Sequence, residues 1–290
     1  MIIDMRLRPP FGGYLDLAIF KVGAEKNISR KGYSPAPSFL QRSVPLLIEE
    51  MDATGTDMGV LLGRQAVAPW GFVKNEDIVE VVKQYPDRLI PFGGVEIVSD
   101  TKKMVAQVEQ CMTEFNFVGI NLEPGFAADA IYPDDRLLYP VYEKCEELGA
   151  LVSISTSAII GPDVGYSDPI RLQHACKDFP NVTFICSHGA WPYVQEIVGV
   201  CFVTPNLYLS PDFYMNVEFM PFGLEYVNAA NQFLEDRLLY GSSYPVRSLE
   251  ESVKRLGELP FRDEEVRSKV AYGNALNLFG SYLKKNGYPV

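Results

Sequence analysis

Histidine is scarce in this chain of 290 residues, since His174 and His188 are the only two. A metal centre built from three or more imidazoles is therefore excluded. The five cysteines are widely spaced and form no CxxC pair, which argues against a zinc ribbon and a disulfide framework. We expect reduced core thiols and a cytoplasmic location. The cysteines are Cys111, Cys145, Cys176, Cys186 and Cys201.

The chain also lacks an excess of positive charge, long apolar runs and linker segments. The net charge of −11 and the isoelectric point near 4.8 argue against nucleic acid or an anionic membrane as a partner. No signal peptide and no apolar run of about 18 residues stands out, so we expect no membrane partner of any kind. Because no Ser/Gly-rich or charge-run segment divides the chain, we predict a single domain over residues 1–290.

The chain does contain a regular alternation of short β-like runs and segments with helical spacing. Four clear helical segments cover residues 75–88, 101–115, 134–149 and 168–181. Eight runs read as strands, and they cover residues 1–8, 57–64, 88–97, 117–124, 150–157, 181–188, 206–210 and 237–245.

Strand and helix alternating eight times predict an α/β fold, the (β/α)8 TIM barrel, for which about 250 residues is a typical length. The alternative is a doubly wound open sheet. That fold would need a glycine-rich phosphate loop after the first strand, and the sequence there, "LRPPFGGY", does not match GxGxxG.

A long segment separates the first strand from the next predicted helix, which covers roughly residues 39–55. The connection has about thirty residues, far more than a usual barrel loop. It contains Phe11, Tyr14, Leu17 and Phe20, so disorder is not expected. We predict a lid over the barrel mouth or part of a subunit interface.

Polar side chains gather where the predicted strands end, which is where TIM barrels place their functional residues. In "IDMRLRPP", residues 3–10, the alternation predicts that Asp4, Arg6 and Arg8 point the same way. Charged side chains are rarely buried without partners, so a shared pocket is the economical explanation. The predicted ring consists of Arg6, Arg8, Arg64, Glu96, Asn121, Glu123, Ser155, His188, Ser210, Asp212 and Ser243.

Six short motifs occur in an order that resembles a known family. They are "ID" on the first strand, then "GINLEPG", "SISTS", "SHGAWP", "LLYGSSYP" and a closing "GNALNLFG". This order resembles the amidohydrolase-2 branch of the amidohydrolase superfamily, which includes aminocarboxymuconate semialdehyde decarboxylase and related decarboxylases, lactonases and hydratases. The resemblance extends over nearly the whole chain and implies the same barrel.

The resemblance also implies a metal site, and this chain departs from it. Typical relatives hold a divalent ion with HxH on strand one, a histidine on strand five, a histidine on strand six and an aspartate on strand eight. The matching positions here are Arg6, Arg8, Ser155, His188 and Ser243. A guanidinium stays protonated and cannot be a ligand, so we expect no metal cofactor. A weak, oxygen-rich site made by His188, Glu123 and Asp212 is the one metal alternative left open.

Arg6 and Arg8 keep positive charge where the resemblance places metal ligands. A planar guanidinium suits a carboxylate, so the two arginines can clamp an acid group or stabilise an oxyanion. The alternative is an internal charge network, because Arg6, Arg8 and Arg64 nearly balance the acidic residues of the ring. We predict a small anionic substrate.

Proton transfer needs a titratable group near this anion. His188 at a strand end is a candidate, as is Glu123, which can equally be an arginine's partner. Asp212 is a third candidate and competes with a role at a turn or helix start in "SPDFY". Ser155 and Ser243 have no base beside them in sequence, so a serine nucleophile is not expected. Predicted substrate contacts are Arg6, Arg8, Arg64, Asn121, Ser155, Trp191, which can also belong to the core, and Ser243.

Two functions follow. The first is a metal-independent, amidohydrolase-related hydrolase or carboxy-lyase acting on a small carboxylate-bearing metabolite. The second is a catalytically silent barrel that binds an acid metabolite. Polar residues at nearly every strand end favour the enzyme. The apolar segment over residues 191–202 also favours a homodimer or larger homo-oligomer.

Overall fold

A single parallel sheet forms the centre of the computed structural model, which describes residues 1–21, 23–30 and 32–288. Its strands follow the order of the chain, each paired in parallel with the next. Parallel strands covered on both faces need apolar side chains throughout, and nearly every strand residue is buried. The strands are β1 (Ile3–Leu7), β2 (Met58–Leu62), β3 (Leu89–Gly94), β4 (Gly119–Leu122), β5 (Leu151–Ser155), β6 (Phe184–Ser187) and β7 (Leu207–Ser210).

The eighth predicted strand closes the barrel without becoming a regular strand. Leu238 forms one parallel bridge to Leu209 of β7. On the other side, the backbone N–H of Met5 in β1 donates to the Tyr240 carbonyl at 2.9 Å. The Tyr240 N–H donates instead to Val270, outside the sheet, which ends the ladder. The prediction of a TIM barrel is confirmed, with seven regular strands and one extended closing segment among the described residues.

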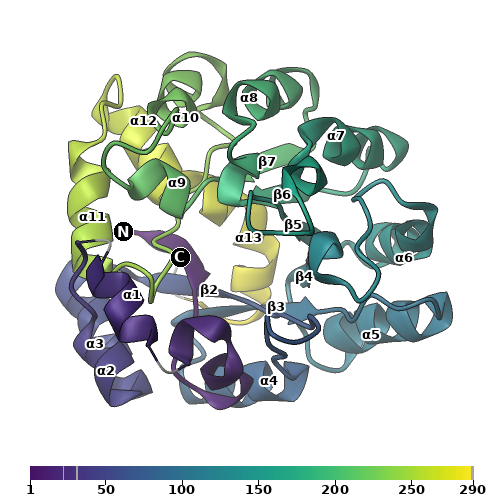
Figure 1. Cartoon of the computed structure of the whole chain (residues 1–290), viewed down its shortest axis with the longest axis horizontal. Helices are drawn as coiled ribbons and strands as arrows, with labels where there is room; N and C mark the ends of the chain where they lie inside the picture. Colours follow the sequence, from purple (N-terminus) through teal and green to yellow (C-terminus); the bar gives the residue numbers. More distant parts are fainter. Residues whose placement is uncertain (22, 31, 289–290) are drawn as a thin grey trace.

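Helices surround the sheet as a ring, and α13 lies inside that ring in the view of Figure 1. All four helical segments singled out from the sequence are helical here. The α-helices are α1 (Ala24–Arg30), α2 (Pro37–Gln41), α3 (Val44–Thr54), α4 (Asn75–Gln84), α5 (Thr101–Thr113), α6 (Tyr139–Leu148), α7 (Pro169–Asp178), α8 (Val194–Val203), α9 (Phe213–Asn216), α10 (Leu224–Ala229), α11 (Leu249–Glu258), α12 (Glu264–Ser268) and α13 (Asn274–Lys285).

Shorter helical turns connect several of these elements. Two are π-helical, and six are 3₁₀ turns placed mainly in the loops that follow strands. They are η1 (Gly12–Asp16), η2 (Ala18–Phe20), η3 (Pro124–Phe126), η4 (Arg136–Leu138), η5 (Val164–Ser167), η6 (His188–Ala190), η7 (Ala230–Leu234) and η8 (Lys269–Gly273).

The C-terminal helix α13 packs against the first strands. Phe279 of α13 is fully buried, and its ring lies 6.1 Å from that of Phe92 in β3. Ile3 and Met58 belong to the same buried cluster. The Tyr288 hydroxyl donates to the Leu89 carbonyl at 2.7 Å, at the start of β3. This packing covers the end of the barrel at which the strands begin and leaves their other ends available for a site.

A bulge in β1 corrects the prediction that Asp4 shares a face with both arginines. Asp4 lies opposite Gly59 and Leu7 lies opposite Leu61, so three steps along β1 match two along β2. Asp4 therefore shares the face of Leu7, while Arg6 and Arg8, which flank Leu7, face the other way. The Asp4 carboxylate accepts from the Arg6 backbone N–H at 2.9 Å and not from its guanidinium.

The described residues of the long segment after β1 form short helices, which agrees with the prediction that this segment is ordered. The helix expected over residues 39–55 is wrong in detail, because the structure divides it into α2 and α3. Arg42 adopts a left-handed conformation (φ 49°) that ends α2. The Ser43 side chain then accepts from the Leu46 N–H, and Pro45 occupies the first turn of α3, where its missing N–H costs nothing.

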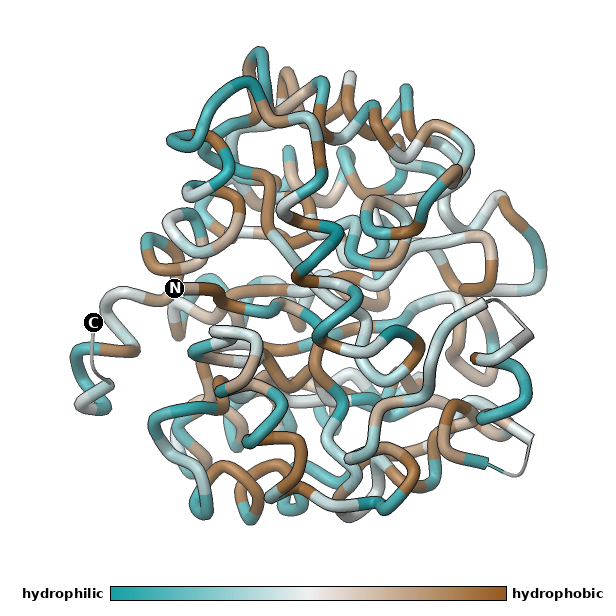
Figure 2. Tube along the Cα trace, turned by 90° about the vertical axis from the view of Figure 1, so that its left-hand side faces the viewer, coloured by the Kyte–Doolittle hydropathy of each residue, from teal (hydrophilic) through white to brown (hydrophobic). Residues whose placement is uncertain are grey.

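Hydrophobic stretches along the chain are short and separated by hydrophilic ones (Figure 2). Among the described residues, no helix combines the length and apolar character required to cross a membrane.

Candidate functional site

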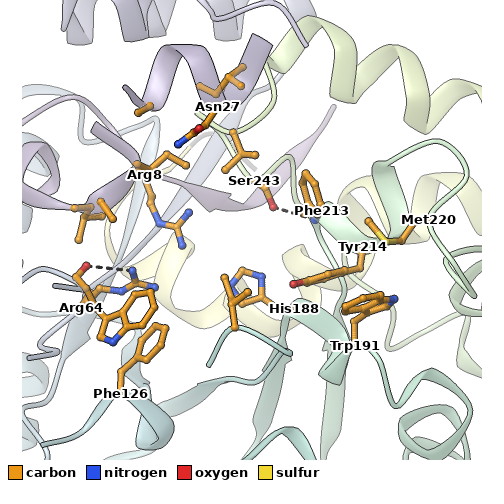
Figure 3. A pocket seen from close by; sticks show the side chains of 18 residues that line it. Arg8, Asn27, Arg64, Phe126, His188, Trp191, Phe213, Tyr214, Met220 and Ser243 are labelled. Carbon is orange, nitrogen blue, oxygen red and sulfur yellow. Dashed lines mark hydrogen bonds between the residues drawn. The ribbon is translucent and has the colours of Figure 1, made fainter. Parts of the chain in front are cut away.

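A cavity of about 500 Å³ opens where the strands end, and Figure 3 shows it from close by. Its wall is mainly aromatic and aliphatic, with Arg8 and Arg64 as the charged members and no carboxylate among the lining residues. Besides Arg8, six of these residues come from the segment after β1, which supports its description as a lid. The lining consists of Arg8, Leu17, Ala18, Ile19, Ala24, Asn27, Ile28, Arg64, Trp70, Phe126, Ile159, His188, Trp191, Phe213, Tyr214, Met220, Ser243 and Val246.

Arg8 is the one cation of this cavity that has no partner among the described residues. Its side chain extends toward the cavity on the side of Arg64, to the upper left of His188 in Figure 3, and it takes part in no hydrogen bond or ion pair with the described residues. Burial lowers the pKa of Arg8 well below its usual range, and the nearby charges of Arg6 and Arg64 lower it further. An anion bound beside this guanidinium would relieve that repulsion.

Arg6 lies deeper, in a chain of hydrogen-bonded side chains under the cavity. Its Nη2 lies 2.7 Å from Nε2 of His188, and its Nη1 lies 3.5 Å from the Ser155 hydroxyl. Nδ1 of His188 lies 2.9 Å from Oδ1 of Asp212. A guanidinium only donates and a carboxylate only accepts, so this geometry fits a neutral imidazole that is protonated at Nδ1.

The charges around His188 keep its imidazole neutral. Burial, followed by the positive charge of Arg6, lowers the pKa of His188 to about 4, although Asp212 acts in the opposite direction. Burial alone would raise the pKa of Asp212, but His188 and Arg6 together hold it below its usual range. At neutral pH the side chains are therefore a carboxylate, a neutral imidazole and a guanidinium.

Arg64 and Glu123 neutralise each other. Nε and Nη2 of Arg64 donate to the two carboxylate oxygens of Glu123, each at 2.6 Å. Burial alone would raise the pKa of Glu123, yet Arg64 holds it below its usual range. Such a bidentate pair is strong and leaves little capacity for a second partner. Of the two roles considered for Glu123, the geometry matches that of an arginine's partner.

The other predicted residues divide between the cavity wall and the layer beneath it. Ser243 lines the cavity and donates to Asp212 at 2.8 Å, while the Phe213 N–H donates to Ser243. Asn121 is buried and donates to the Gly63 carbonyl at 2.8 Å. Glu96 does not join the site, because it pairs with Lys103 on the surface at 2.6 Å.

Backbone conformation at the site is unusual. His188 (φ 69°), Asp212 (φ 41°) and Ser243 (φ 63°) all have the positive φ that ordinary residues avoid, at a cost of order 1–3 kcal/mol each. Gly189 (φ 61°) continues this conformation, and a Cβ there would lie 2.8 Å from the Tyr226 hydroxyl. Three strained residues that bond to one another mark a constrained site.

Two stacked aromatic pairs form walls of the cavity, and the sequence singled out only one of their four members, Trp191. Trp70 stacks on Phe126 with ring centroids 4.2 Å apart, and Trp191 stacks on Tyr214 with centroids 5.1 Å apart. In Figure 3, Phe126 lies on the same side as Arg8, and the pair of Trp191 and Tyr214 lies on the other side of His188. Trp191 thus lies on the cavity wall. The sequence offered one signal for Tyr214, namely its position only four residues after Ser210, the last residue of β7.

These features define a barrel of the kind that binds a small ligand over the ends of its strands, with polar and charged residues on the cavity floor. The amidohydrolase family model matches residues 34–281, and the chain belongs to that family.

Two curated relatives match parts of the chain. A 2-keto-4-carboxy-3-hexenedioate hydratase from Sphingobium sp. is 29% identical over 204 residues, which are 56% of this chain and 59% of the relative. A 2-amino-3-carboxymuconate-6-semialdehyde decarboxylase from Dictyostelium discoideum is 32% identical over 89 residues, 31% of this chain and 24% of the relative. Each match covers less than two thirds of the relative's length.

Solved structures match almost the whole chain. An uncharacterized TIM-barrel protein from Bordetella bronchiseptica is 39% identical, with a TM-score of 0.90 over 99% of both chains. A dihydroxybenzoic acid decarboxylase from Polaromonas sp. JS666 has the same fold, with a TM-score of 0.66, 19% identity and coverage of 91% and 96%. That structure holds manganese and an inhibitor, 2-nitroresorcinol.

The residues around His188 do not fit a divalent ion. Arg6 cannot donate an electron pair, and its Nη2 faces the Nε2 that a metal would need on His188. In the described part of the chain, no group of three or more His, Cys, Asp or Glu side chains is arranged to hold a metal ion.

Proposed function

We propose that this protein is a lyase of the amidohydrolase family that binds a small, unsaturated carboxylate, with Arg8 holding the carboxylate group. The observation that carries the proposal is the Arg8 guanidinium, which reaches a largely apolar cavity without a partner among the described residues. A hydrogen bond from such a group to a carboxylate is stronger than one between neutral groups. The hydratase and decarboxylase among the curated relatives support lyase chemistry over hydrolysis.

The flat walls of the cavity suit a planar ligand. Residues of both stacked pairs line the cavity, so a conjugated or aromatic acid can lie against Phe126 or Tyr214. Among the described residues that line the cavity, Arg8 alone offers an uncompensated charge, since Glu123 neutralises Arg64. The cavity therefore favours a ligand with one carboxylate near Arg8 and less charge elsewhere.

Within this proposal, His188 is the predicted proton-transfer group that reaches the cavity, whereas Glu123 and Asp212 are not among its lining residues. In decarboxylation or hydration, negative charge develops on the substrate, and a positively charged floor lowers the energy of that state. For His188 to accept a proton, Nε2 must first lose its contact with Arg6. Chemistry without a metal is part of the proposal.

A second candidate is a barrel that binds an acid without converting it. The observation that favours it is that His188, Glu123 and Asp212 each already have an internal partner.

One experiment separates the two candidates. Benzoate, hydroxybenzoates and unsaturated di- and tricarboxylates are titrated by calorimetry and then incubated with the protein, and loss of CO₂ or gain of water is followed by mass spectrometry. Binding with conversion supports the lyase, and binding without conversion supports the silent barrel. No binding of any carboxylate contradicts both.

The predicted homo-oligomer also remains a proposal. Phe202 at the end of α8 is 64% exposed, and its ring lies 4.9 Å from that of Phe233, which is 38% exposed. Apolar surface of this kind is typical of interfaces. Light scattering should give at least a dimer at micromolar concentration, and Phe202→Asp should shift it toward monomer. A wild-type monomer contradicts the proposal.

A further inference from the structure

Arg6 is a buried cation held by neutral atoms. Buried arginines normally face a carboxylate directly, because an isolated charge is costly to remove from water. Among the described residues, no carboxylate lies within ion-pair distance of Arg6, and its side-chain contacts are the His188 imidazole and the Ser155 hydroxyl. The nearest counter-charge in this chain of contacts, Asp212, is reached through His188.

An imidazole nitrogen and an oxygen are also the kinds of atom that bind metal ions. Here they converge from the ends of β5 and β6 on a guanidinium that β1 supplies. The cation is therefore part of the polypeptide and cannot dissociate. Because guanidinium has no vacant orbital, it supplies charge and directional N–H groups and does not activate water as a metal does.

We propose that Arg6 is the fixed internal cation of this site, occupying Nε2 of His188 and thereby setting the orientation and tautomer of that ring, while Arg8 alone is left to bind the substrate. Arg6 is thus a positioning residue. That its charge also favours negative charge on a bound substrate rests on the proposed function, whereas its contact with His188 does not.

Two physical consequences follow. First, His188 must carry its proton on Nδ1, since Nε2 faces a donor at 2.7 Å and Nδ1 faces Asp212 at 2.9 Å. Second, a divalent ion cannot reach Nε2 unless Arg6 moves away. Arg8 makes no such contact, so the same substitution at Arg8 should leave the ring nitrogens as they are.

The chain offers a direct test, because ¹⁵N-histidine labelling gives signals from only two imidazoles. His174, which is 51% exposed and pairs with Asp134, serves as the internal control. At pH 7 we expect His188 to show a protonated Nδ1 and an unprotonated, hydrogen-bonded Nε2. Added MnCl₂ should broaden the His188 signals no more than those of His174. A protonated Nε2, or selective broadening of His188 by Mn²⁺, overturns the proposal.

Variants add a second readout. Arg6→Met should move the Nε2 resonance of His188, Arg6→Lys should restore it in part, and Arg8→Met should leave it unchanged. An Arg6→Met spectrum equal to that of the wild type contradicts the proposal. If Arg6→Met does not fold, the wild-type spectrum and the Mn²⁺ titration still decide. Carboxylate binding to the wild type is a separate measurement, so failure of the proposed function would be recognised independently.

Discussion

Arg6 in β1 and Arg8, which directly follows this strand, point to the same side, yet their surroundings differ. Arg6 lies beneath the cavity, fully buried, with His188 and Ser155 as hydrogen-bond partners. Arg8 is partly buried, lines the cavity and has no hydrogen-bonding partner in the described part of the chain. One position serves the internal structure of the site, and the other is available to a ligand.

The difference shows that charge alone does not identify a binding group. The charged residues of the floor already have internal partners, as in the bidentate pair of Arg64 and Glu123. In the part of the chain that the structure describes, the cavity lining contains one cation without a hydrogen-bond partner, Arg8. Substitutions in the floor should therefore change mainly stability, and substitution of Arg8 should change mainly binding.

The largest effect is expected at Arg64. Arg64→Met removes the partner of Glu123, whose side chain is only 5% exposed. Leaving a buried carboxylate unpaired should lower the free energy of unfolding by about 3–5 kcal/mol. Urea denaturation measures this loss. The control is Arg64→Met combined with Glu123→Leu, which should recover much of it; a double variant as unstable as the single one would contradict the assignment.

The next effect concerns pH and the neutral state of His188. Its pKa is about 4 when folded against 6.5 as the ordinary value, so between these pH values the unfolded chain binds the extra proton. Stability should therefore fall as pH decreases through this window, by about 3 kcal/mol from this residue. His188→Asn removes the titration, and asparagine tolerates the left-handed backbone. Unfolding free energies at pH 7 and pH 4 should differ less in the variant; equal pH dependence would contradict the lowered pKa.

Much of the fold could be predicted from the sequence because the barrel depends on a local, repeated pattern. Strand and helix alternation and apolar runs place β1 to β7 without tertiary information. The bulge in β1 could not be predicted, because nothing within residues 3–8 reveals the pairing with β2. The division between α2 and α3 could have been predicted from the sequence. Ser43 followed by Pro45 is a pattern typical of a helix start, and it lies inside the helix that was predicted as continuous.

The strand-end rule brought Arg6, Arg8, His188, Asp212 and Ser243 together, since the carboxyl ends of barrel strands meet at one face. It could not predict which charges pair, because pairing depends on ångström-scale distances between different strands. The sequence thus left open whether Glu123 is a base or a partner, and it placed Glu96 in the ring although that side chain turns to the surface.

The smallest expected effect provides the most direct test, namely carboxylate binding by the Arg8→Met variant. The acid that binds best in the carboxylate screen is titrated into wild type, Arg8→Met and the surface control Arg136→Met, with its uncharged amide as a matched ligand. We expect Arg8→Met to weaken binding of the acid by about 1.5–3 kcal/mol, the usual value for a hydrogen bond to a charged group. Binding of the amide and the melting temperature should change little. Unchanged binding of the acid with a lowered melting temperature would contradict the assignment of Arg8 as the substrate's anion-binding residue.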